Sequence, residues 1–192
     1  MKRVGVLALQ GDFEAHGRAL ARAGALPVYV RTAEDLNSVD GLVLPGGEST
    51  AMLKLLHSQN LFEPLQKYAA QAPVFGTCAG VILLASDVSN PHQESLGVLD
   101  ITVERNGYGR QIDSAIAELE PTGDFEARTS PGKLEAVFIR APIIRRAGPA
   151  AKVLAEYRGN PVLVEQDRYL AATFHPELTL DHRTHELFLK KL

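Results

Sequence analysis

The sequence has very little of what marks an exported or membrane protein. It contains a single cysteine, which can form neither an internal disulfide nor a cysteine-rich zinc site, so a reducing compartment is expected. Every apolar run is far shorter than the roughly 20 residues that a membrane-spanning helix requires. The first three residues lead into a strand-like segment and not into the apolar part of a secretory signal. We therefore expect a soluble, cytoplasmic protein that does not enter a membrane.

An excess of charge of either sign is also missing. Lysine and arginine number 20 against 23 aspartate and glutamate residues, which gives a net charge of -3, and no run of like charges occurs. Binding to nucleic acid needs a concentrated basic face, which this sequence does not supply. The expected partners are therefore small molecules or other proteins.

What the sequence does contain is the composition of an ordinary globular chain. Hydrophobic residues make up 45% and charged residues 22%, which excludes disordered, collagenous and coiled-coil proteins. A chain of 192 residues can bury roughly 70% of its unfolded surface, so it needs no disulfide or metal to fold. No repeat, low-complexity tract or linker divides it. We predict a single domain over 1–192.

The first half alternates between strand and helix patterns. Short apolar runs indicate strands at 4–9, 26–30, 41–44 and 73–75. Apolar residues at helical spacing predict helices at 13–23, 49–59 and 61–71. Strands that alternate with helices form a mainly parallel sheet with helices on both faces, because the crossovers are right-handed.

The second half indicates antiparallel additions to this sheet. Residues 97–105 and 134–139 alternate between apolar and polar, and 153–157 can pair with 162–165 across a turn. A strand at 169–173 and a helix at 181–190 complete the pattern. The expected fold class is α/β, with a mostly parallel central sheet and antiparallel additions.

The segment GTCAG at 76–80 has the spacing of a nucleophile elbow, a tight turn between a strand and a helix. The flanking glycines, Gly76 and Gly80, remove Cβ clashes, and Cys78 projects from the turn between them. The N-terminus of the following helix favours the thiolate, and the Ala79 N–H faces a developing oxyanion. A lone cysteine is otherwise a small buried hydrophobe, so it is the elbow that favours a nucleophile.

A thiolate nucleophile requires a base, and the base requires a group that orients it. His175 lies where the last strand is expected to end, and Glu177 can contact one imidazole nitrogen while the other faces Cys78. His182 and His185 could join His175 in a metal site, but no cysteine or carboxylate cluster at ligand spacing accompanies them. We expect no metal, and we expect these two histidines on a face of the last helix.

The loop PGGEST at 45–50 joins a strand to a helix whose first N–H groups lack internal partners. Such a loop can bind an anion, although its two glycines could also form only a tight turn. It is not a P-loop, because the Lys-Ser/Thr of that motif is missing and Glu48 would repel phosphate. An N–H of Gly47 that serves as the second oxyanion donor fits the pattern better.

Six segments together resemble the glutaminase subunits of pyridoxal 5'-phosphate synthase, a family of class I glutamine amidotransferases. They are LQG at 9–11, PGGEST at 45–50, GTCAG at 76–80, VERN with GRQ at 103–106 and 109–111, FIRAP at 138–142 and FHPEL at 174–178. The resemblance covers nearly the whole chain, and Val81 and Tyr108 are minor departures from the family pattern. It implies one glutaminase domain with a three-layer α/β sandwich.

The resemblance also implies roles for individual residues. It makes Cys78 the nucleophile, His175 the general base and acid, and Glu177 the residue that orients His175. The family's glutamine site corresponds to Gly47, Glu48, Ser49, Arg105, Ile139 and Arg140. A free amino acid carries an ammonium and a carboxylate, which need partners of opposite charge. No cofactor is implied, and the ammonia released from L-glutamine passes to a separate synthase subunit in a hetero-oligomer.

Two other functions stay open at the level of sequence. A cysteine hydrolase of the dienelactone type could also carry an elbow cysteine and a late histidine, although it would not explain the glycine loop and the arginines. The chain could also be a non-catalytic binding or regulatory subunit, and replacing Cys78 would then change nothing.

Overall fold

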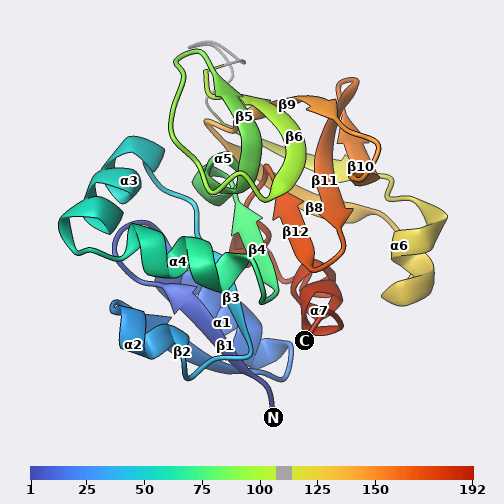
Figure 1. Cartoon of the computed structure of the whole chain (residues 1–192). Coiled ribbons are helices and arrows are strands. Elements are labelled where there is room, and N and C mark those ends of the chain that lie inside the picture. Colours follow the sequence, from blue (N-terminus) through green and yellow to red (C-terminus); the bar gives the residue numbers. More distant parts are fainter. Residues whose placement is uncertain (107–113) are drawn as a thin grey trace.

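A seven-stranded sheet forms the centre of the structure, a computed structural model that describes residues 1–106 and 114–192 (Figure 1). The strands lie in the order β10-β11-β12-β4-β3-β1-β2. In that order they span Lys152–Tyr157, Asn160–Gln166, Tyr169–Ala172, Val74–Thr77, Gly41–Leu44, Arg3–Leu7 and Leu26–Val30. The strands from β12 to β2 are parallel, whereas β11 runs antiparallel to both of its neighbours. The predicted mostly parallel sheet with antiparallel additions is confirmed.

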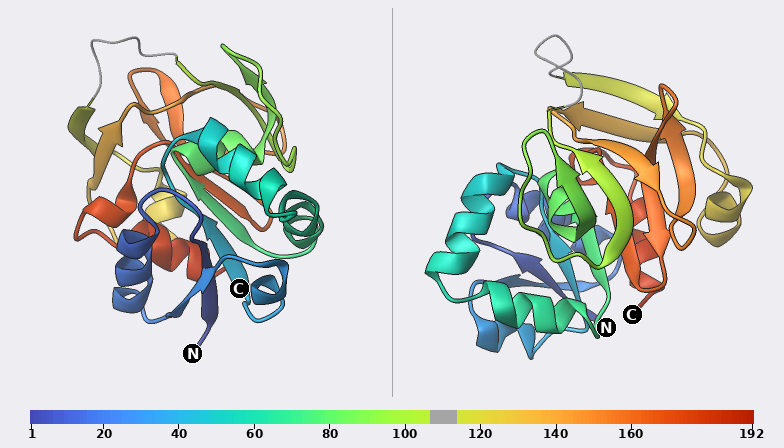
Figure 2. Two further views of the ribbon diagram at one scale, coloured as in Figure 1. Left: turned by 90° about the vertical axis from the view of Figure 1, so that its left-hand side faces the viewer. Right: turned by 45° about the horizontal axis from the view of Figure 1, so that its top comes forward.

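Helices cover both sides of this sheet (Figure 2). On one side lie α1 and α7, and on the other α3, α4 and α5; they span Phe13–Arg22, Arg183–Leu189, Ser49–Ser58, Phe62–Ala69 and Ala79–Leu84. The side chains of β3 alternate between these layers. Val43 packs with Leu20 of α1 and Phe188 of α7, whereas Leu42 and Leu44 pack with α3 and α4. None of the helices in the described ranges is long and apolar enough to cross a lipid bilayer.

A three-stranded sheet packs on the α3–α5 side. In it β5 (Ala85–Ser89) pairs parallel with β6 (Leu99–Glu104), which pairs antiparallel with β9 (Ile143–Ala147). The strand predicted at 97–105 is confirmed as β6. The sequence did not indicate β5, because this strand begins directly after α5 and no turn residue separates the two.

A hairpin-like pair lies on the side of α1 and α7. Its strands are β7 (Ser114–Leu119) and β8 (Leu134–Ile139), joined through α6 (Gly123–Arg128). The strand at 134–139 was predicted with these bounds. β7 was not, because it is rich in Ala, Ser and Glu, which form strands poorly without a pairing partner.

The other predicted elements are also present. β10 and β11 form the antiparallel hairpin expected from 153–157 and 162–165, with Val153 opposite Val164. Two single-turn helices, α2 (Ala33–Leu36) and η1 (Pro176–Leu178), were not predicted, because one turn is too short to give a periodic signal.

The elbow after β4 requires glycine at positions 76 and 80, because a Cβ atom at either position would clash with backbone atoms. A Cβ atom on Gly80 would lie 2.1 Å from the Leu44 carbonyl oxygen of β3. A Cβ atom on Gly76 would lie 2.6 Å from the backbone of Gly80. Both contacts involve backbone, which cannot rotate away as a side chain can. The two glycines therefore allow α5 to begin against the ends of β3 and β4.

We predict that Gly80→Ala lowers the free energy of unfolding by about 1–3 kcal/mol, the usual cost of overpacking a buried position. Chemical denaturation measures the change. Gly123→Ala is the matched control, because a Cβ at Gly123 meets nothing within 4 Å. A Gly80→Ala variant as stable as this control would show that the close approach to Leu44 carries no strain.

Candidate active site

Cys78 lies in the turn between β4 and α5. Its backbone has a φ of 48° and a ψ of -106°, and its N–H donates a 2.9 Å hydrogen bond to the Ala172 carbonyl of β12. A non-glycine residue with positive φ stores roughly 1–3 kcal/mol of strain, which the surrounding structure has to hold. The side chain is buried, and its Sγ lies 3.8 Å from the Ile139 carbonyl oxygen. The predicted elbow is therefore present, with Cys78 at its apex.

His175 and Glu177 follow the end of β12, the strand beside β4. The N–H of His175 donates to the Val137 carbonyl of β8 at 2.8 Å, which fixes its backbone. Its Nδ1 lies 2.7 Å from Oε1 of Glu177, and His175 and Cys78 line the same hollow. The side chain of Glu177 is fully buried. The structure thus brings the three residues together in the order that the sequence suggested.

Burial and the neighbouring groups shift the pKa values of His175 and Glu177 in opposite directions. Burial disfavours the imidazolium form of His175, but its hydrogen bonds to Cys78 and Glu177 outweigh this effect and raise the pKa of His175 to about 10. Burial likewise disfavours the Glu177 carboxylate, but His16 and His175 outweigh it and hold the pKa of Glu177 below its ordinary value. At neutral pH His175 is therefore a cation that can protonate a leaving group.

The glycine loop passes directly over the Cys78–His175 pair. A Cβ atom on Gly46 would lie 2.4 Å from the His175 ring and 3.3 Å from the Cys78 Cβ. The Gly46 carbonyl oxygen lies against Gly11, where an added Cβ would be only 1.8 Å from it. Because the carbonyl and the N–H of a trans peptide point in opposite directions, the Gly47 N–H points away from Gly11.

Glu48 fixes the far end of this loop. Its N–H donates to Oε1 of Gln10 at 3.0 Å, and its carboxylate accepts the N–H groups of Thr50 at 2.9 Å and Ala51 at 2.7 Å. Its Oε1 also lies 3.7 Å from Nη2 of Arg105. Burial is the largest single effect and opposes the charge, but these partners together outweigh it and hold the pKa of Glu48 below its ordinary value. Glu48 is thus the N-cap of α3 as well as a negative group beside Cys78.

A cleft of 350 Å³ opens beside Cys78, within the range of roughly 300–1,000 Å³ usual for small-molecule sites. It is lined by Gln10, Gly47, Glu48, Ser49, Cys78, Ala79, Ile82, Arg105, Asn106, Arg140 and Pro142. Most of the residues predicted for glutamine binding therefore meet at one place. Gln10 and Asn106 were not singled out as site residues, although each belongs to a segment that carries the family resemblance.

Two of the predicted substrate residues face the site differently from the rest. Ile139 lines a neighbouring hollow of 260 Å³ with His175 and Arg140, and its carbonyl oxygen lies 3.8 Å from Sγ of Cys78. Ser49 is buried, and its hydroxyl donates to Oε1 of Gln93 at 3.0 Å. The Ser49 side chain is therefore engaged with the protein, and only its backbone is free for a ligand.

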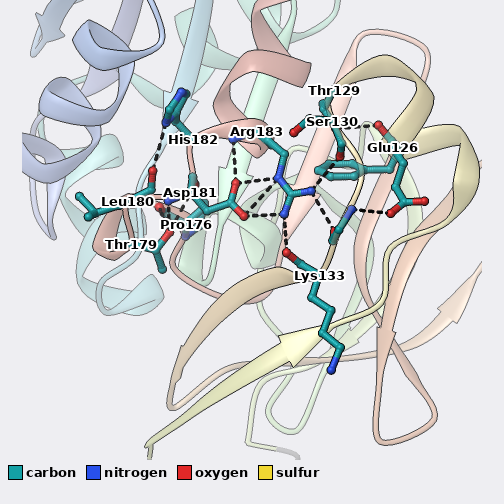
Figure 3. A network of polar contacts seen from close by, with 12 residues as sticks. Glu126, Thr129, Ser130, Lys133, Pro176, Thr179, Leu180, Asp181, His182 and Arg183 are labelled. Carbon is teal, nitrogen blue, oxygen red and sulfur yellow. Dashed lines mark hydrogen bonds and ion pairs between the residues drawn. The ribbon is translucent and has the colours of Figure 1, made fainter.

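The segment after Glu177 is anchored by a single arginine (Figure 3). The Arg183 guanidinium binds the Asp181 carboxylate through Nε and Nη2, and it also donates to the carbonyls of Ser130, Gly132 and Lys133. These contacts tie the start of α7 to the loop before β8. The segment that follows Glu177 is thereby held against the start of β8.

The two histidines near the C-terminus, His182 and His185, lie in different surroundings. His182 is partly exposed beside Glu186, but His185 is fully buried and its Nε2 lies 3.1 Å from Nδ1 of His16. His185 lies on α7 as expected, on the face that packs on the sheet together with Phe188, and His182 is the residue directly before this helix. Within residues 1–106 and 114–192, no group of three or more His, Cys, Asp or Glu side chains could hold a metal ion.

Comparison with known proteins identifies the family. Residues 6–192 match the SNO glutamine amidotransferase family. The chain belongs to this family. It is 64% identical over 192 residues to "Pyridoxal 5'-phosphate synthase subunit PdxT" of Solibacter usitatus, with 100% of both chains covered. It is 55% identical to the protein of the same name from Koribacter versatilis, with 98% of this chain and 94% of that chain covered.

Solved structures agree with this assignment. A structure described as a glutamine amidotransferase superposes with a TM-score of 0.88 at 45% identity, and the match covers 98% of this chain and 97% of that one. A chain in the structure of PurLQS from Thermotoga maritima shares the fold, with a TM-score of 0.72 at 17% identity over 99% of both chains. The predicted three-layer α/β fold of the glutamine amidotransferases is confirmed. The GRQ segment at 109–111 and Tyr108, which were part of the sequence resemblance, lie outside the described residues.

The raised pKa of His175 can be tested by titration. An ordinary imidazole, with a pKa of 6.5, is neutral at about pH 8, whereas His175 should still be a cation there and lose its proton only near pH 10. NMR of the ring nitrogens follows this directly. His185 is an internal reference, because burial lowers its pKa to about 3 and keeps it neutral throughout. A neutral His175 ring at about pH 8 would contradict the assignment.

Proposed function

We propose that this chain is the glutaminase subunit of a pyridoxal 5'-phosphate synthase, which hydrolyses L-glutamine to glutamate and ammonia. The observation that carries the proposal is the line of Cys78, His175 and Glu177 beside a cleft with groups of both charges. The names of the relatives support the role in the synthase. The whole chain, 1–192, acts as one glutaminase domain in the cytoplasm, without metal or cofactor, and passes ammonia to a synthase subunit.

In the first half of the reaction, the Cys78 thiolate attacks the side-chain amide carbon of glutamine. The carbonyl oxygen becomes an oxyanion, which the N–H groups of Gly47 and Ala79 stabilise. His175 then gives its proton to the amide nitrogen, and the C–N bond breaks to release ammonia. A γ-glutamyl thioester on Cys78 and a neutral His175 remain.

In the second half, a water molecule takes the place of ammonia. His175 removes a proton from this water as its oxygen attacks the thioester carbon, and the C–S bond breaks. Glutamate leaves, and the thiolate and the imidazolium are restored. Glu177 stays ionised and keeps Nδ1 of His175 in place through both halves.

The charges of the cleft suit a free amino acid. Arg105 and Arg140 bind the substrate carboxylate, and Glu48 binds its ammonium. Arg105 is held ready, because its Nη2 donates a 2.7 Å hydrogen bond to Oγ1 of Thr50. Gly47, Ser49 and Ile139 complete the substrate site through backbone atoms.

Variants of the triad test the proposed function. With the synthase subunit present, Cys78→Ala should abolish glutamate release, since loss of a nucleophile costs on the order of 10⁶ in kcat. Glu177→Gln should leave residual activity, because Glu177 only orients His175. Glu186→Gln, at a half-exposed position of α7, is the matched control and should leave the rate unchanged.

Glutamine turnover by Cys78→Ala at the wild-type rate would refute the role of Cys78. Hydrolysis of esters by the wild-type protein, with none of glutamine, would favour the dienelactone type of cysteine hydrolase instead.

The arginines should act on substrate binding. Replacing Arg105 or Arg140 by Ala should chiefly raise the KM for glutamine, by about tenfold to a hundredfold, because each charged hydrogen bond contributes about 1.5–3 kcal/mol. Arg158→Ala, in the exposed turn between β10 and β11, serves as the control. An unchanged KM in both variants would remove these residues from the substrate site.

A further inference from the structure

Another histidine lies directly behind the triad. His16 belongs to the face of α1 that packs on the sheet, and its ring stands edge-on to Phe75 of β4. It is fully buried, as are His185 of α7 and Thr77 at the end of β4. The ends of β4 and β12 and the two helices of this layer therefore enclose a small polar cluster below the elbow.

The contacts of this cluster place Glu177 between two imidazoles. Oε1 of Glu177 lies 2.7 Å from Nδ1 of His175, and Oε2 lies 3.3 Å from Nε2 of His16. The same His16 nitrogen is 2.9 Å from Oγ1 of Thr77, and the other His16 nitrogen is 3.1 Å from Nε2 of His185. Within the described part of the chain, Oε2 of Glu177 has no hydrogen-bond partner. The nearby His16 ring is therefore the group that stabilises the negative charge on this oxygen.

The positions of the protons follow from the neighbours. Burial lowers the pKa values of His16 and His185, so both are neutral at pH 7 and carry one N–H each. A proton on Nδ1 of His16 would turn the Nε2 lone pair towards the carboxylate. It would also leave a His185 N–H without an acceptor, because Nδ1 of His185 has no hydrogen-bond partner in the described ranges.

The opposite arrangement gives both imidazole N–H groups an acceptor. His185 donates from Nε2 to Nδ1 of His16, and His16 directs its Nε2–H towards Thr77 and Glu177. Among the ring nitrogens of the two histidines, the one left without a partner in the described residues is then Nδ1 of His185, as a lone pair, which costs less than a buried N–H without a partner. The two N–H dipoles therefore both point towards the Glu177 carboxylate.

The orientation of the His16 N–H towards Glu177 matters during the reaction, because the charge of His175 changes. His175 alternates between cation and neutral ring, so the buried carboxylate loses its positive neighbour once in each cycle. A buried carboxylate without compensation rotates towards other donors or takes up a proton. The His16 N–H opposes both changes during the half of the cycle in which His175 is neutral.

We propose that His16 is a positioning residue for the glutaminase reaction: oriented by His185, it holds the second oxygen of Glu177 so that the first stays aligned with His175. The inference rests on the proposed glutaminase function. The charged or titratable groups that act on this cluster are Cys78, His175, Glu177, Asp12, Arg22, His182 and His185.

The test compares His16→Phe with wild type in two measurements. With the synthase subunit present, kcat should fall by about tenfold to a hundredfold at an unchanged KM, the usual effect of losing a partner that orients a catalytic or ligating group. Without glutamine, the NMR titration midpoint of His175 should fall by about one pH unit, because a Glu177 carboxylate that turns away from Nδ1 stabilises the imidazolium less. His57→Gln, at an exposed position near the end of α3, is the control and should change neither.

Two further variants cover the case in which His16→Phe does not fold. Gln places its amide N–H close to the position of the imidazole Nε2, whereas Asn places it close to Nδ1. His16→Gln should therefore keep a kcat at least about threefold above that of His16→Asn. Equal kcat values for these two, or an unchanged His175 titration in folded His16→Phe, overturn the proposal. A wild-type protein that fails to hydrolyse glutamine would refute the proposed function, while the titration would still decide the role of His16.

Discussion

The left-handed backbone of Cys78 is the constraint on which the rest of the site depends. A positive φ at this residue is stable only because β12 accepts the Cys78 N–H and because Gly80 lets α5 start against Leu44. The same pairing of β4 with β12 sets Thr77 opposite Ala172, so the chain that leaves β12 must pass beside the elbow. The sulfur and the imidazole are thus brought together by the register of two parallel strands.

The ionisation of Glu177 and His175 depends on their buried neighbours. The carboxylate of Glu177 is removed from water, yet it stays ionised because imidazoles lie on both of its oxygens. His175 in turn stays cationic because it lies between that carboxylate and Cys78. The cleft proposed for the substrate lies beside the elbow, where the side chains of Glu48 and Arg105 are more exposed than that of Glu177. The buried groups are therefore those proposed to transfer protons, and the more exposed groups are those proposed to bind the charges of the substrate.

Much of this could be predicted from the sequence, and what could not has physical reasons. The glycines at 76 and 80, the spacing of His175 and Glu177, and the strand–helix alternation are local patterns, and each is present in the structure. The burial of His185 and its contact with His16 are not local, since 169 positions separate the two residues along the chain. A histidine at helical spacing does not reveal whether its face of the helix meets solvent or another histidine.

The central claim is that ammonia released at Cys78 supplies the nitrogen of the synthase product, and isotope labelling tests it most directly. The complex is given glutamine with ¹⁵N in its side-chain amide, in a buffer that contains unlabelled ammonium. The wild-type complex should place ¹⁵N in the ring of pyridoxal 5'-phosphate, and a Cys78→Ala complex should make only unlabelled product. Unlabelled product from the wild-type complex, or labelled product from the variant, would contradict the account.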